Sequence, residues 1–295
     1  MKRVLLIVAA AVMAAATTAQ NPTIESGADE VIVHWNNDTA PHSSLDPKAE
    51  VVVKRGSGYK VTHTSETVFY LFKAQNPTGH AIAHFPGGGY ESVNLNFGMA
   101  KWLSQNGITT VIVKYRLPNG HREVPLEDAK AAVAFLRQNA ERLGIDPNKV
   151  GVSGNSAGGH LAAWSSNVLE DERPNFAVLI YPVISGKIWS SRSQQATLER
   201  LLGKWRTDID IENHSCELLV TPQTPPTLLL HSDDDDLAAT CNSTLYYKAL
   251  KHHGVKASLH FYPSGGHGWF GRDKWEYRQQ WLEAVKEWAS SFINV

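Results

Sequence analysis

Short apolar runs alternate with amphipathic segments through the middle of the chain. The runs at 81–85, 108–115 and 150–153 are apolar or β-branched and are bounded by glycine or proline, which predicts buried strands. The intervals 97–106 and 125–143 carry apolar residues at helical spacing and are each followed by glycine, which predicts helices. Strands that alternate with helices in this way imply parallel pairing through right-handed crossovers.

The flanking segments extend this sheet in both directions. Three early apolar segments, at 31–35, 51–53 and 67–72, are joined by loops too short for crossover helices, so we expect antiparallel strands there. Three later strands and a closing helix follow, at 176–181, 227–231, 257–261 and 274–293. We therefore predict an α/β fold with a mainly parallel twisted sheet, antiparallel N-terminal strands and helices on both faces.

Residues 183–224 break this rhythm. They are mostly polar, with a helical patch at 197–202. An insertion at this point in an α/β sheet lies above the carboxyl ends of the strands, where such sheets bind ligands. We predict a cap or rim over the site, and a surface excursion away from the site is the alternative.

Residues 1–19 have the pattern of a secretory signal. Lys2 and Arg3 precede an apolar run at 4–16, which is shorter than the ~20 residues that span a bilayer. This predicts a single mature domain, 20–295, that acts in a periplasm or in the medium and does not bind a membrane after cleavage. An uncleaved N-terminal anchor is the alternative. The net charge is −1 and the sequence has no basic block, which argues against a nucleic-acid partner.

The chain has two cysteines, Cys216 and Cys241. They could pair outside the cytoplasm, but their spacing leaves the pairing open. Two cysteines without a histidine-rich ligand pattern do not make a metal site, and we predict neither a metal nor a cofactor.

The stretch from Gly154 to Gly158 has the pattern Gly-x-Ser-x-Gly between an apolar run and a helical segment. This is the strand–turn–helix arrangement of a nucleophile elbow, in which a serine is exposed on a strained turn. The two glycines leave room where the chain passes close to itself, and the helix after Ser156 directs free N–H groups at the reacting oxygen. An ordinary glycine-rich turn is the alternative for this motif taken alone.

The other two parts of a catalytic triad follow in the order that α/β hydrolases use. A serine nucleophile needs a base, and the base needs an orienting carboxylate. Ser156, the acidic run 233–236 and His267 each come directly after a predicted strand, in the order serine, acid, histidine. Flanking glycines favour His267 as the base, whereas His84 and His160 are expected to make structural hydrogen bonds. The pattern does not select one aspartate from the four.

Three consecutive glycines, 87–89, follow Pro86 at the end of the strand at 81–85. They let backbone N–H groups approach a ligand without side chains in the way, as an oxyanion hole requires. We predict that this loop supplies such donors, and a plain flexible loop is the alternative.

Several longer motifs recur in a fixed order over nearly the whole mature chain. They are PGGGY at 86–90, KYRLP at 114–118, PLEDA at 125–129, GNSAGGH at 154–160, YPV at 181–183, VTP and TPPT within 220–227, and GGHG at 265–268. With these motifs the chain resembles the α/β-hydrolase serine esterases that include bacterial acetyl xylan esterases and feruloyl-esterase-like enzymes.

The resemblance implies an α/β-hydrolase fold and a role for individual residues. It makes Ser156 the nucleophile and His267 the base, and it selects Asp235, four residues after His231, as the acid. The oxyanion donors that it implies are the backbone N–H of Ala157 and that of Gly88 or Gly89.

The chain departs from the family pattern at three points. The run 236–239 replaces a valine-rich turn that ends in proline, which affects the shape of the acid loop. Asn155 stands where the family more often has an aromatic residue, and Trp269 stands where it more often has phenylalanine. Both are expected at the pocket rim, where they affect the choice of substrate.

The resemblance and the secretion signal together imply two-step ester hydrolysis on acylated carbohydrates or small esters. O-acetyl groups on xylan or a related plant polysaccharide are the favoured substrate, with feruloyl, pectin-linked and simple aliphatic esters as alternatives. Four aromatic residues are candidates for an apolar platform under a sugar ring, with core packing as the alternative for each: Tyr90, Trp189, Trp205 and Trp269.

Three other classes of protein compete with this hypothesis. A serine peptidase of the prolyl-oligopeptidase type shares the elbow and the order of the triad, although this chain has no room for the large propeller of such enzymes. A secreted glycan-binding protein could use an inactive hydrolase fold. A metal-dependent deacetylase is disfavoured because the sequence has no ligand cluster.

Overall fold

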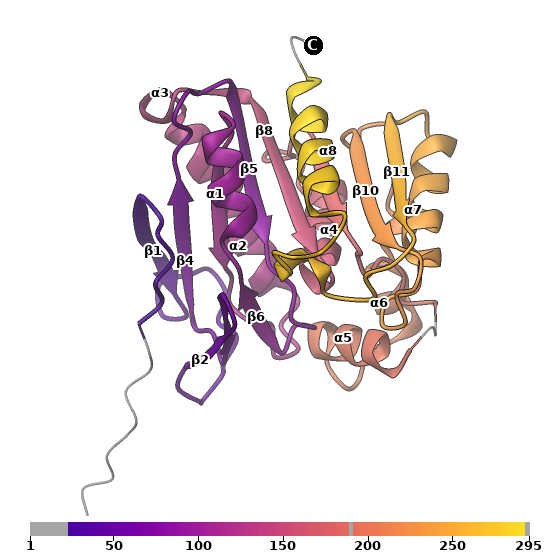
Figure 1. Cartoon of the computed structure of the whole chain (residues 1–295). Helices are drawn as coiled ribbons and strands as arrows, with labels where there is room; N and C mark the ends of the chain where they lie inside the picture. The colour runs from indigo at the N-terminus through magenta and orange to yellow at the C-terminus, as the bar shows by residue number, and fades with distance from the viewer. Residues whose placement is uncertain (1–22, 189–190, 293–295) are drawn as a thin grey trace, which may run out of the picture.

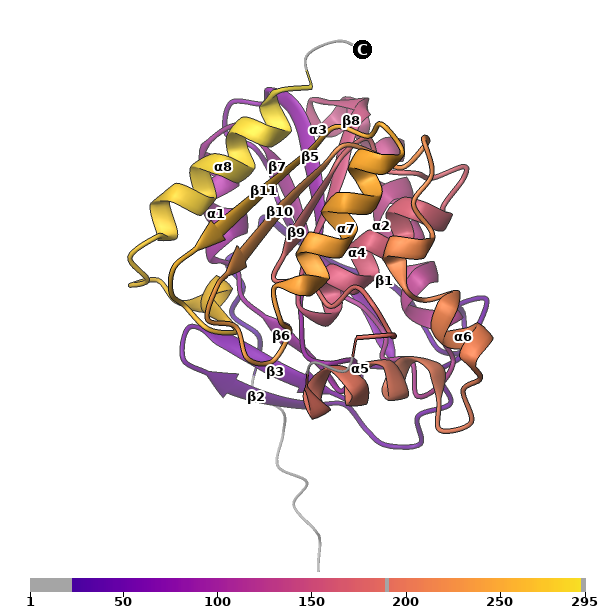
Figure 2. The same ribbon diagram turned by 90° about the vertical axis from the view of Figure 1, so that its right-hand side faces the viewer.

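An eight-stranded sheet forms the middle layer of the protein, with helices on both faces (Figure 1; Figure 2). The structure is a computed structural model that describes residues 23–188 and 191–292. Across the sheet the strands are β1 (Glu30–Asn36), β4 (Glu66–Phe72), β7 (Thr109–Lys114), β5 (Gly79–Phe85), β8 (Ile145–Asn155), β9 (Ala177–Ile180), β10 (Thr227–Ser232) and β11 (Ala257–Tyr262). The β1–β4 and β4–β7 pairs are antiparallel and all other neighbours are parallel, which confirms the predicted fold class.

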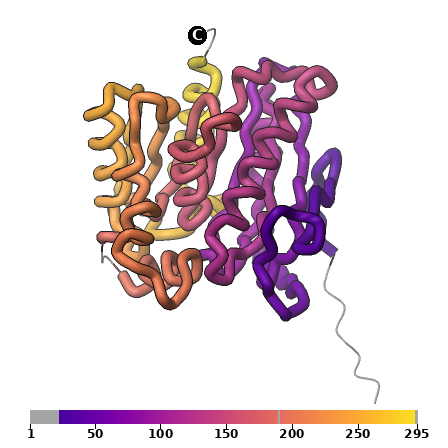
Figure 3. The backbone as a smooth tube through the Cα atoms, turned by 180° about the vertical axis from the view of Figure 1, so that it is seen from behind, coloured from indigo at the N-terminus to yellow at the C-terminus, as the bar shows by residue number. Residues whose placement is uncertain are grey.

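Two helical layers bury the two faces of this sheet. One layer is α1 (Gly98–Gln105) and α8 (Arg278–Ser290); the other is α2 (Glu123–Gln138), α4 (Ala157–Val168) and α7 (Cys241–His252), which are in front in the view from behind (Figure 3). A short helix, α3 (Ala140–Leu143), follows α2. The predicted closing helix at 274–293 begins later, at Arg278, and residues 274 and 276–277 form turns instead.

Alternate residues of each central strand enter opposite halves of the core. On β5, Ala81 and Ala83 pack with the α2 and α4 layer, whereas Ile82 packs with the α1 and α8 layer. On β10, Leu229 and Leu228 divide in the same way. Because side chains alternate along a strand, a sheet that is covered on both faces needs continuous apolar runs, and this is the pattern that made these strands visible in the sequence.

A second, three-stranded antiparallel sheet lies below the main sheet, at the edge to which the parallel strands point (Figure 1; Figure 2). It consists of β2 (Val51–Arg55), β3 (Gly58–Thr62) and β6 (Ser92–Leu95), of which only β2 was predicted. On the same side of the main sheet are α5 (Arg192–Leu202) and α6 (Asp208–Glu212), which belong to the segment 183–224 (Figure 2). Two short 3₁₀ turns, Cys216–Leu218 and Trp269–Gly271, complete the elements.

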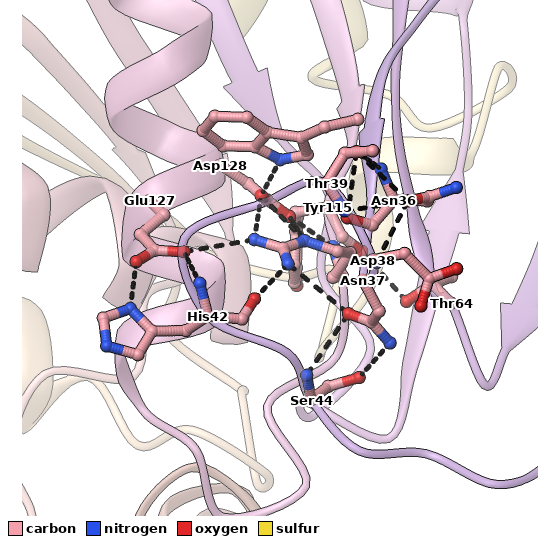
Figure 4. Close-up of polar contacts among 12 residues, drawn as sticks. Asn36, Asn37, Asp38, Thr39, His42, Ser44, Thr64, Tyr115, Glu127 and Asp128 are labelled. Atoms are coloured by element: carbon pink, nitrogen blue, oxygen red, sulfur yellow. Dashed lines mark hydrogen bonds and ion pairs between the residues drawn. The ribbon is translucent and has the colours of Figure 1, made fainter.

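A buried ion pair joins the N-terminal segment to the centre of the fold (Figure 4). Arg116 is the second residue after β7. Its guanidinium donates to Asp128 of α2, with Nη2–Oδ1 at 2.8 Å and Nε–Oδ1 at 3.0 Å, and both side chains are fully buried. The indole Nε1 of Trp35 donates to the same Asp128 oxygen at 2.7 Å. Arg116 also donates to the backbone carbonyl of His42. The pair therefore fixes residues 35–42 against α2.

No helix among the described residues is both long and apolar enough to cross a bilayer. The predicted signal, residues 1–19, lies outside the described residues, and so does Trp189.

Candidate active site

Ser156 lies on a sharp turn between β8 and α4. Its backbone has φ 56° and ψ −121°, a left-handed conformation that an L-residue adopts only under constraint. The turn is held by two backbone hydrogen bonds, from Ser156 N to Ile180 O at 3.0 Å and from Val183 N to Ser156 O at 3.2 Å. A Cβ on Gly154 would stand 2.0 Å from the carbonyl oxygen of Gly158, so only glycine fits the close approach on either side of the serine.

Three side chains that are distant in sequence meet at the carboxyl edge of the sheet. The hydroxyl Oγ of Ser156 is 2.8 Å from His267 Nε2, and His267 Nδ1 is 2.7 Å from Asp235 Oδ2. They follow β8, β11 and β10, of which β10 and β11 are neighbours in the main sheet and β8 is separated from β10 by β9 (Figure 1). This order of contacts allows the imidazole to accept the serine proton while the carboxylate fixes the ring and stabilises its positive charge.

Asp235 is the buried member of the four consecutive aspartates. Its Oδ1 accepts the backbone N–H groups of Leu237 and Ala238, both at 2.9 Å, and its Oδ2 lies 3.3 Å from His231 Nε2 as well as beside His267. Burial alone would raise the pKa of this carboxyl, but the hydrogen bonds from His231 and His267 outweigh burial and hold the pKa well below its usual value. The carboxylate is therefore ionised at neutral pH.

The three other aspartates are exposed, and one of them supports the histidine loop. Asp234 accepts hydrogen bonds from the backbone N–H of Gly265 and of Gly266. Arg272 donates to the carbonyl oxygens of Gly265 and His267 from the other side. The loop that carries His267 is thus held at several points.

The glycine loop after β5 is held in one conformation by its neighbours. Gly88 has φ 143°, and a Cβ there would lie 2.0 Å from the carbonyl oxygen of Ser92. Ser92 N donates to Gly88 O at 3.1 Å, Asn94 N donates to Gly87 O at 2.9 Å, and the hydroxyl of Tyr115 donates to Pro86 O at 2.8 Å.

Three backbone N–H groups at this edge have no hydrogen-bond acceptor within the described part of the chain: Gly88, Gly89 and Ala157. Ala157 is the first residue of α4, where the helix itself offers no acceptor. Gly88, Gly89 and Ser156 all line one cavity. Free N–H groups beside a reactive hydroxyl are what is needed to bind a developing oxyanion.

The cavity beside Ser156 has a volume of about 430 Å³. One wall is the glycine loop, another is α5 with Gln194, Thr197 and Arg200, and a third is the acid loop with Leu237 and Ala238. Arg200 pairs with Glu91 at 2.9 Å and donates to Gly89 O at 3.3 Å. Part of the segment 183–224 therefore borders the space above Ser156.

The proposed aromatic platform does not line this cavity where the structure describes it. Tyr90 is buried with its hydroxyl 3.0 Å from His160 Nδ1, and Trp269 is fully buried and stacked on Trp275 at 4.3 Å between ring centroids. Trp205 is 88% exposed and is not among the lining residues. Burial in the core removes more apolar surface from water than a rim position, which explains the first two.

Asn155, which was expected at the pocket rim, and Tyr181, which was given no site role, connect the parts of the site. Asn155 accepts the N–H of Gly87 at 3.1 Å and its Nδ2 is 3.3 Å from the hydroxyl of Tyr181. The ring of Tyr181 packs on the His267 imidazole, with centroids 4.7 Å apart. In the sequence, the signals for Tyr181 were its place at the end of the predicted strand 176–181 and in the YPV motif at 181–183.

Two further histidines near the site are buried and neutral. Burial lowers the pKa of His84 to about 3 and that of His160 to about 4. His84 bonds to Ser153 at 2.7 Å, and His160 contacts Tyr90 and the carbonyl of His214. The expectation that both make structural hydrogen bonds is confirmed.

No cluster of three or more metal-ligating side chains occurs among the described residues. Both cysteines are free thiols, with Cys216 buried and Cys241 exposed at the start of α7.

Comparison with known proteins adds a family to this geometry. Residues 82–271 match a family described as having the alpha/beta hydrolase fold. The chain is 35% identical over 235 residues to an acetylxylan esterase of Xylanibacter ruminicola, which covers 75% of this chain and 47% of that protein. An ethyl acetate hydrolase of Pseudomonas putida is 34% identical over 131 residues, or 41% of each chain.

Solved structures extend this likeness over most of the fold. The crystal structure of an acetyl ester-xyloside bifunctional hydrolase from Caldicellulosiruptor lactoaceticus is 30% identical with a TM-score of 0.72, covering 89% of this chain and 96% of that one. Against the two curated relatives above, the matched region spans less than half of their length.

Proposed function

The chain belongs to the α/β-hydrolase family, and from this premise we propose that it is a secreted serine esterase that releases O-acetyl groups from xylan or a related plant polysaccharide. The likeness to an acetylxylan esterase and to an acetyl ester-xyloside hydrolase supports the class of substrate. The observation that carries the proposal is the continuous contact from Asp235 through His267 to the hydroxyl of Ser156, beside free backbone N–H groups.

The proposed reaction has two steps that share one proton carrier. Ser156 Oγ attacks the acetyl carbonyl while His267 Nε2 takes its proton, and the N–H groups of the glycine loop and Ala157 stabilise the oxyanion. The carbon–oxygen bond to the sugar then breaks, and the sugar hydroxyl leaves with the proton from His267. Water, deprotonated by His267, attacks the acetyl-serine, and acetate leaves as the serine hydroxyl is restored.

Replacement of the nucleophile tests the mechanism. We expect Ser156→Ala to lower kcat for 4-nitrophenyl acetate by at least ~10³-fold and to abolish covalent labelling by a fluorophosphonate. The matched serine control is Ser153→Ala, because Ser153 lies three residues earlier, on β8, and its hydroxyl bonds to His84. Wild-type rates in Ser156→Ala would refute the mechanism, and a wild-type protein that does not react with the fluorophosphonate would support a binding protein on an inactive fold.

A panel of polymers tests the acyl group. We expect acetate release from acetylated xylan to exceed ferulate release from feruloylated xylan and methanol release from methyl-esterified pectin. Dominant ferulate release would replace the acetyl proposal by a feruloyl esterase, which is the second candidate. Cleavage of aminoacyl-arylamides in preference to esters would favour a peptidase.

Secretion is tested separately from chemistry. The proposed signal ends at Ala19, so the mature protein recovered from a periplasmic or culture fraction is expected to begin at Gln20. A protein that keeps Met1 and sediments with membranes would indicate an uncleaved anchor instead.

A further inference from the structure

A second cavity continues from the one beside Ser156. It has a volume of about 260 Å³ and lies between the turn that joins β2 to β3, the end of β6 and the residues around Gly271. The two cavities share Asn94, Asn155, Tyr181 and Gly268 in their walls, so they adjoin across these residues. Together they form one cleft that runs from α5, past Ser156, to the small sheet, and these two elements border the carboxyl edge of the main sheet (Figure 2). An acetyl group alone needs only a small part of this space.

The charges that line the cleft are unbalanced. Arg192 and Arg200 line the first cavity, and Arg55 and Lys60 line the second. Glu91 is the one carboxylate among the described lining residues, and it already pairs with Arg200. A cleft with an excess of cationic groups is unexpected from composition alone, because the chain as a whole has a net charge of −1.

Three of these cations have no ion-pair partner within the described parts of the chain: Arg55, Lys60 and Arg192. The proposed ester hydrolysis gives them no role either, because the triad and the oxyanion donors form a separate set of contacts. Unpaired cations along a cleft concentrate the electrostatic field and attract anionic ligands.

We propose that this cleft binds acetylated oligosaccharides that carry carboxylate groups, such as uronic-acid substituents. The inference rests on the proposed esterase function and specifies its substrate class. The acetyl group is bound beside Ser156, the sugar chain crosses Asn155 and Tyr181, and a carboxylate on the chain pairs with Arg55 and Lys60 in the second cavity. Arg192 serves a substituent on the α5 side.

The experiment compares one acidic oligosaccharide with its own neutral form. An acetylated xylo-oligosaccharide that bears a uronic acid and the same compound with that carboxyl methyl-esterified differ only in charge. We expect kcat/KM for acetate release to be higher for the acidic form at low salt, and the ratio of the two values to fall towards one as ionic strength rises. Equal kcat/KM values for the two forms at low salt would overturn the proposal.

Charge variants locate the effect. We expect the double variant Arg55→Gln, Lys60→Gln to lower the acidic-to-neutral ratio by about three- to tenfold, as exposed ion pairs allow. The matched control is Lys248→Gln, Lys251→Gln, which removes the same charge from the exposed side of α7 and is expected to keep the wild-type ratio. An unchanged ratio in the cleft variant, or an equal fall in the control, would contradict the assignment. A ratio within one protein is insensitive to partial loss of folded enzyme.

Binding separates this inference from the esterase proposal. Ser156→Ala protein, titrated by calorimetry with the deacetylated acidic oligosaccharide, is expected to bind it and to bind its methyl ester more weakly. Acid-selective binding without acetate release by the wild type would leave the cleft assignment standing and refute the acetyl esterase. Acetate release without acid-selective binding would refute the cleft assignment alone.

Discussion

At the scale of single residues, the site combines a fully hydrogen-bonded carboxylate with backbone N–H groups that have no acceptor among the described residues. Both oxygens of Asp235 accept hydrogen bonds, and the histidine that it orients is also covered by the ring of Tyr181. A carboxylate held in this way is already charged and ordered before the reaction begins, so no conformational entropy is lost in positioning it. The buried histidines beside the site behave differently: they have no carboxylate partner in the described parts of the chain, so burial lowers their pKa and keeps them neutral.

His160 is one such group, and it predicts how stability depends on pH. Burial lowers its folded pKa from 6.5 to about 4, so between these values the unfolded chain binds a proton that the folded chain does not. The free energy of unfolding therefore falls as pH falls from about 6.5 to 4, with a contribution on the order of 3 kcal/mol from this residue. Urea unfolding at pH 7, 5.5 and 4.5 measures the slope.

The variant His160→Gln is expected to show a shallower slope than the wild type, whatever its stability at pH 7. The control His252→Gln changes an exposed histidine at the end of α7 and is expected to keep the wild-type slope. Identical slopes in the wild type and His160→Gln would show that His160 is not the group responsible.

Asn155 predicts a kinetic effect at the same scale. Its side chain accepts the N–H of Gly87 and so fixes the first residue of the glycine loop, without touching the proposed reacting atoms. We expect Asn155→Ala to lower kcat for 4-nitrophenyl acetate by about tenfold, with a smaller change in KM, because a misplaced oxyanion donor weakens transition-state binding more than ground-state binding. Steady-state kinetics measure the split.

Tyr181→Phe provides the matched comparison for this variant. It removes the hydroxyl at the other end of the Asn155 side chain but leaves the amide free to hold Gly87. We expect a smaller loss of kcat than in Asn155→Ala. A larger loss in Tyr181→Phe would place the main effect at the Tyr181 hydroxyl, which also accepts the N–H of Phe270 at 3.3 Å, instead of at the glycine loop.

At the scale of elements, the glycine loop presents backbone N–H groups, and not side chains, to the cavity beside Ser156. Its conformation is set by β6, which buries Val93 and Leu95 in the core and donates hydrogen bonds from Ser92 N and Asn94 N to the loop carbonyls. Only glycine can take the backbone angle and the spacing found at residue 88. The position of the glycine loop therefore depends on the small sheet through its strand β6.

Gly88→Ala tests this dependence. The added methyl would overlap the Ser92 carbonyl and would also require a positive φ, so the loop has to move and its free N–H groups leave their present positions. We expect kcat to fall by ~10²–10³-fold, comparable to the loss of one oxyanion donor. Gly254→Ala is the control, because Gly254 also has a positive φ, of 73°, but nothing lies within 4 Å of the added Cβ.

Gly254→Ala is expected to keep the wild-type kcat, with at most a modest loss of stability from its positive φ. Near-wild-type kcat in a folded Gly88→Ala variant would remove the glycine loop from the mechanism. Circular dichroism of both variants establishes that the comparison is between folded proteins.

At the scale of the whole molecule, the parts that the sequence predicted are those that depend on burial alone. Strands β5, β7 and β10 are apolar on both faces because helices cover both, and their runs stand out in the sequence. Strands β3 and β6 were missed because they are short and half polar, and they exist through pairing with each other, as between Lys60 and Asn94. Local pattern carries no information about such partners.

The candidate site divides along the same line. The order of Ser156 and His267 after strand ends follows from topology, which a sequence reveals. The choice of Asp235 needed a family resemblance, since four adjacent carboxylates look alike until a loop buries one of them. The exposed position of Trp205 and the buried position of Trp269 depend on packing between distant elements, which neither spacing nor composition records.

The Arg116–Asp128 ion pair connects the stability of the fold to the site (Figure 4). Tyr115, the neighbour of Arg116, holds Pro86 at the start of the glycine loop, so the pair stabilises the fold and positions the loop. We expect Asp128→Ala to cost about 3 kcal/mol of unfolding free energy, because it leaves a fully buried guanidinium with only the more exposed Glu127 carboxylate, 3.3 Å away, as a charge partner. Chemical denaturation measures the cost, and Glu141→Ala, an exposed acidic residue of α3, is expected to stay within about 0.5 kcal/mol of the wild type.

An apolar replacement of the whole pair distinguishes lost charge balance from lost packing. In Arg116→Met, Asp128→Leu no buried charge remains unpaired, so we expect the double variant to be more stable than Asp128→Ala by at least about 2 kcal/mol. Its kcat should nevertheless stay below that of the wild type, because Trp35 and His42 lose their partners and Tyr115 is less firmly placed. A double variant no more stable than Asp128→Ala would mean that shape, and not the unpaired charge, sets the cost. Recovery of both stability and wild-type kcat would show that the glycine loop keeps its position without the ion pair.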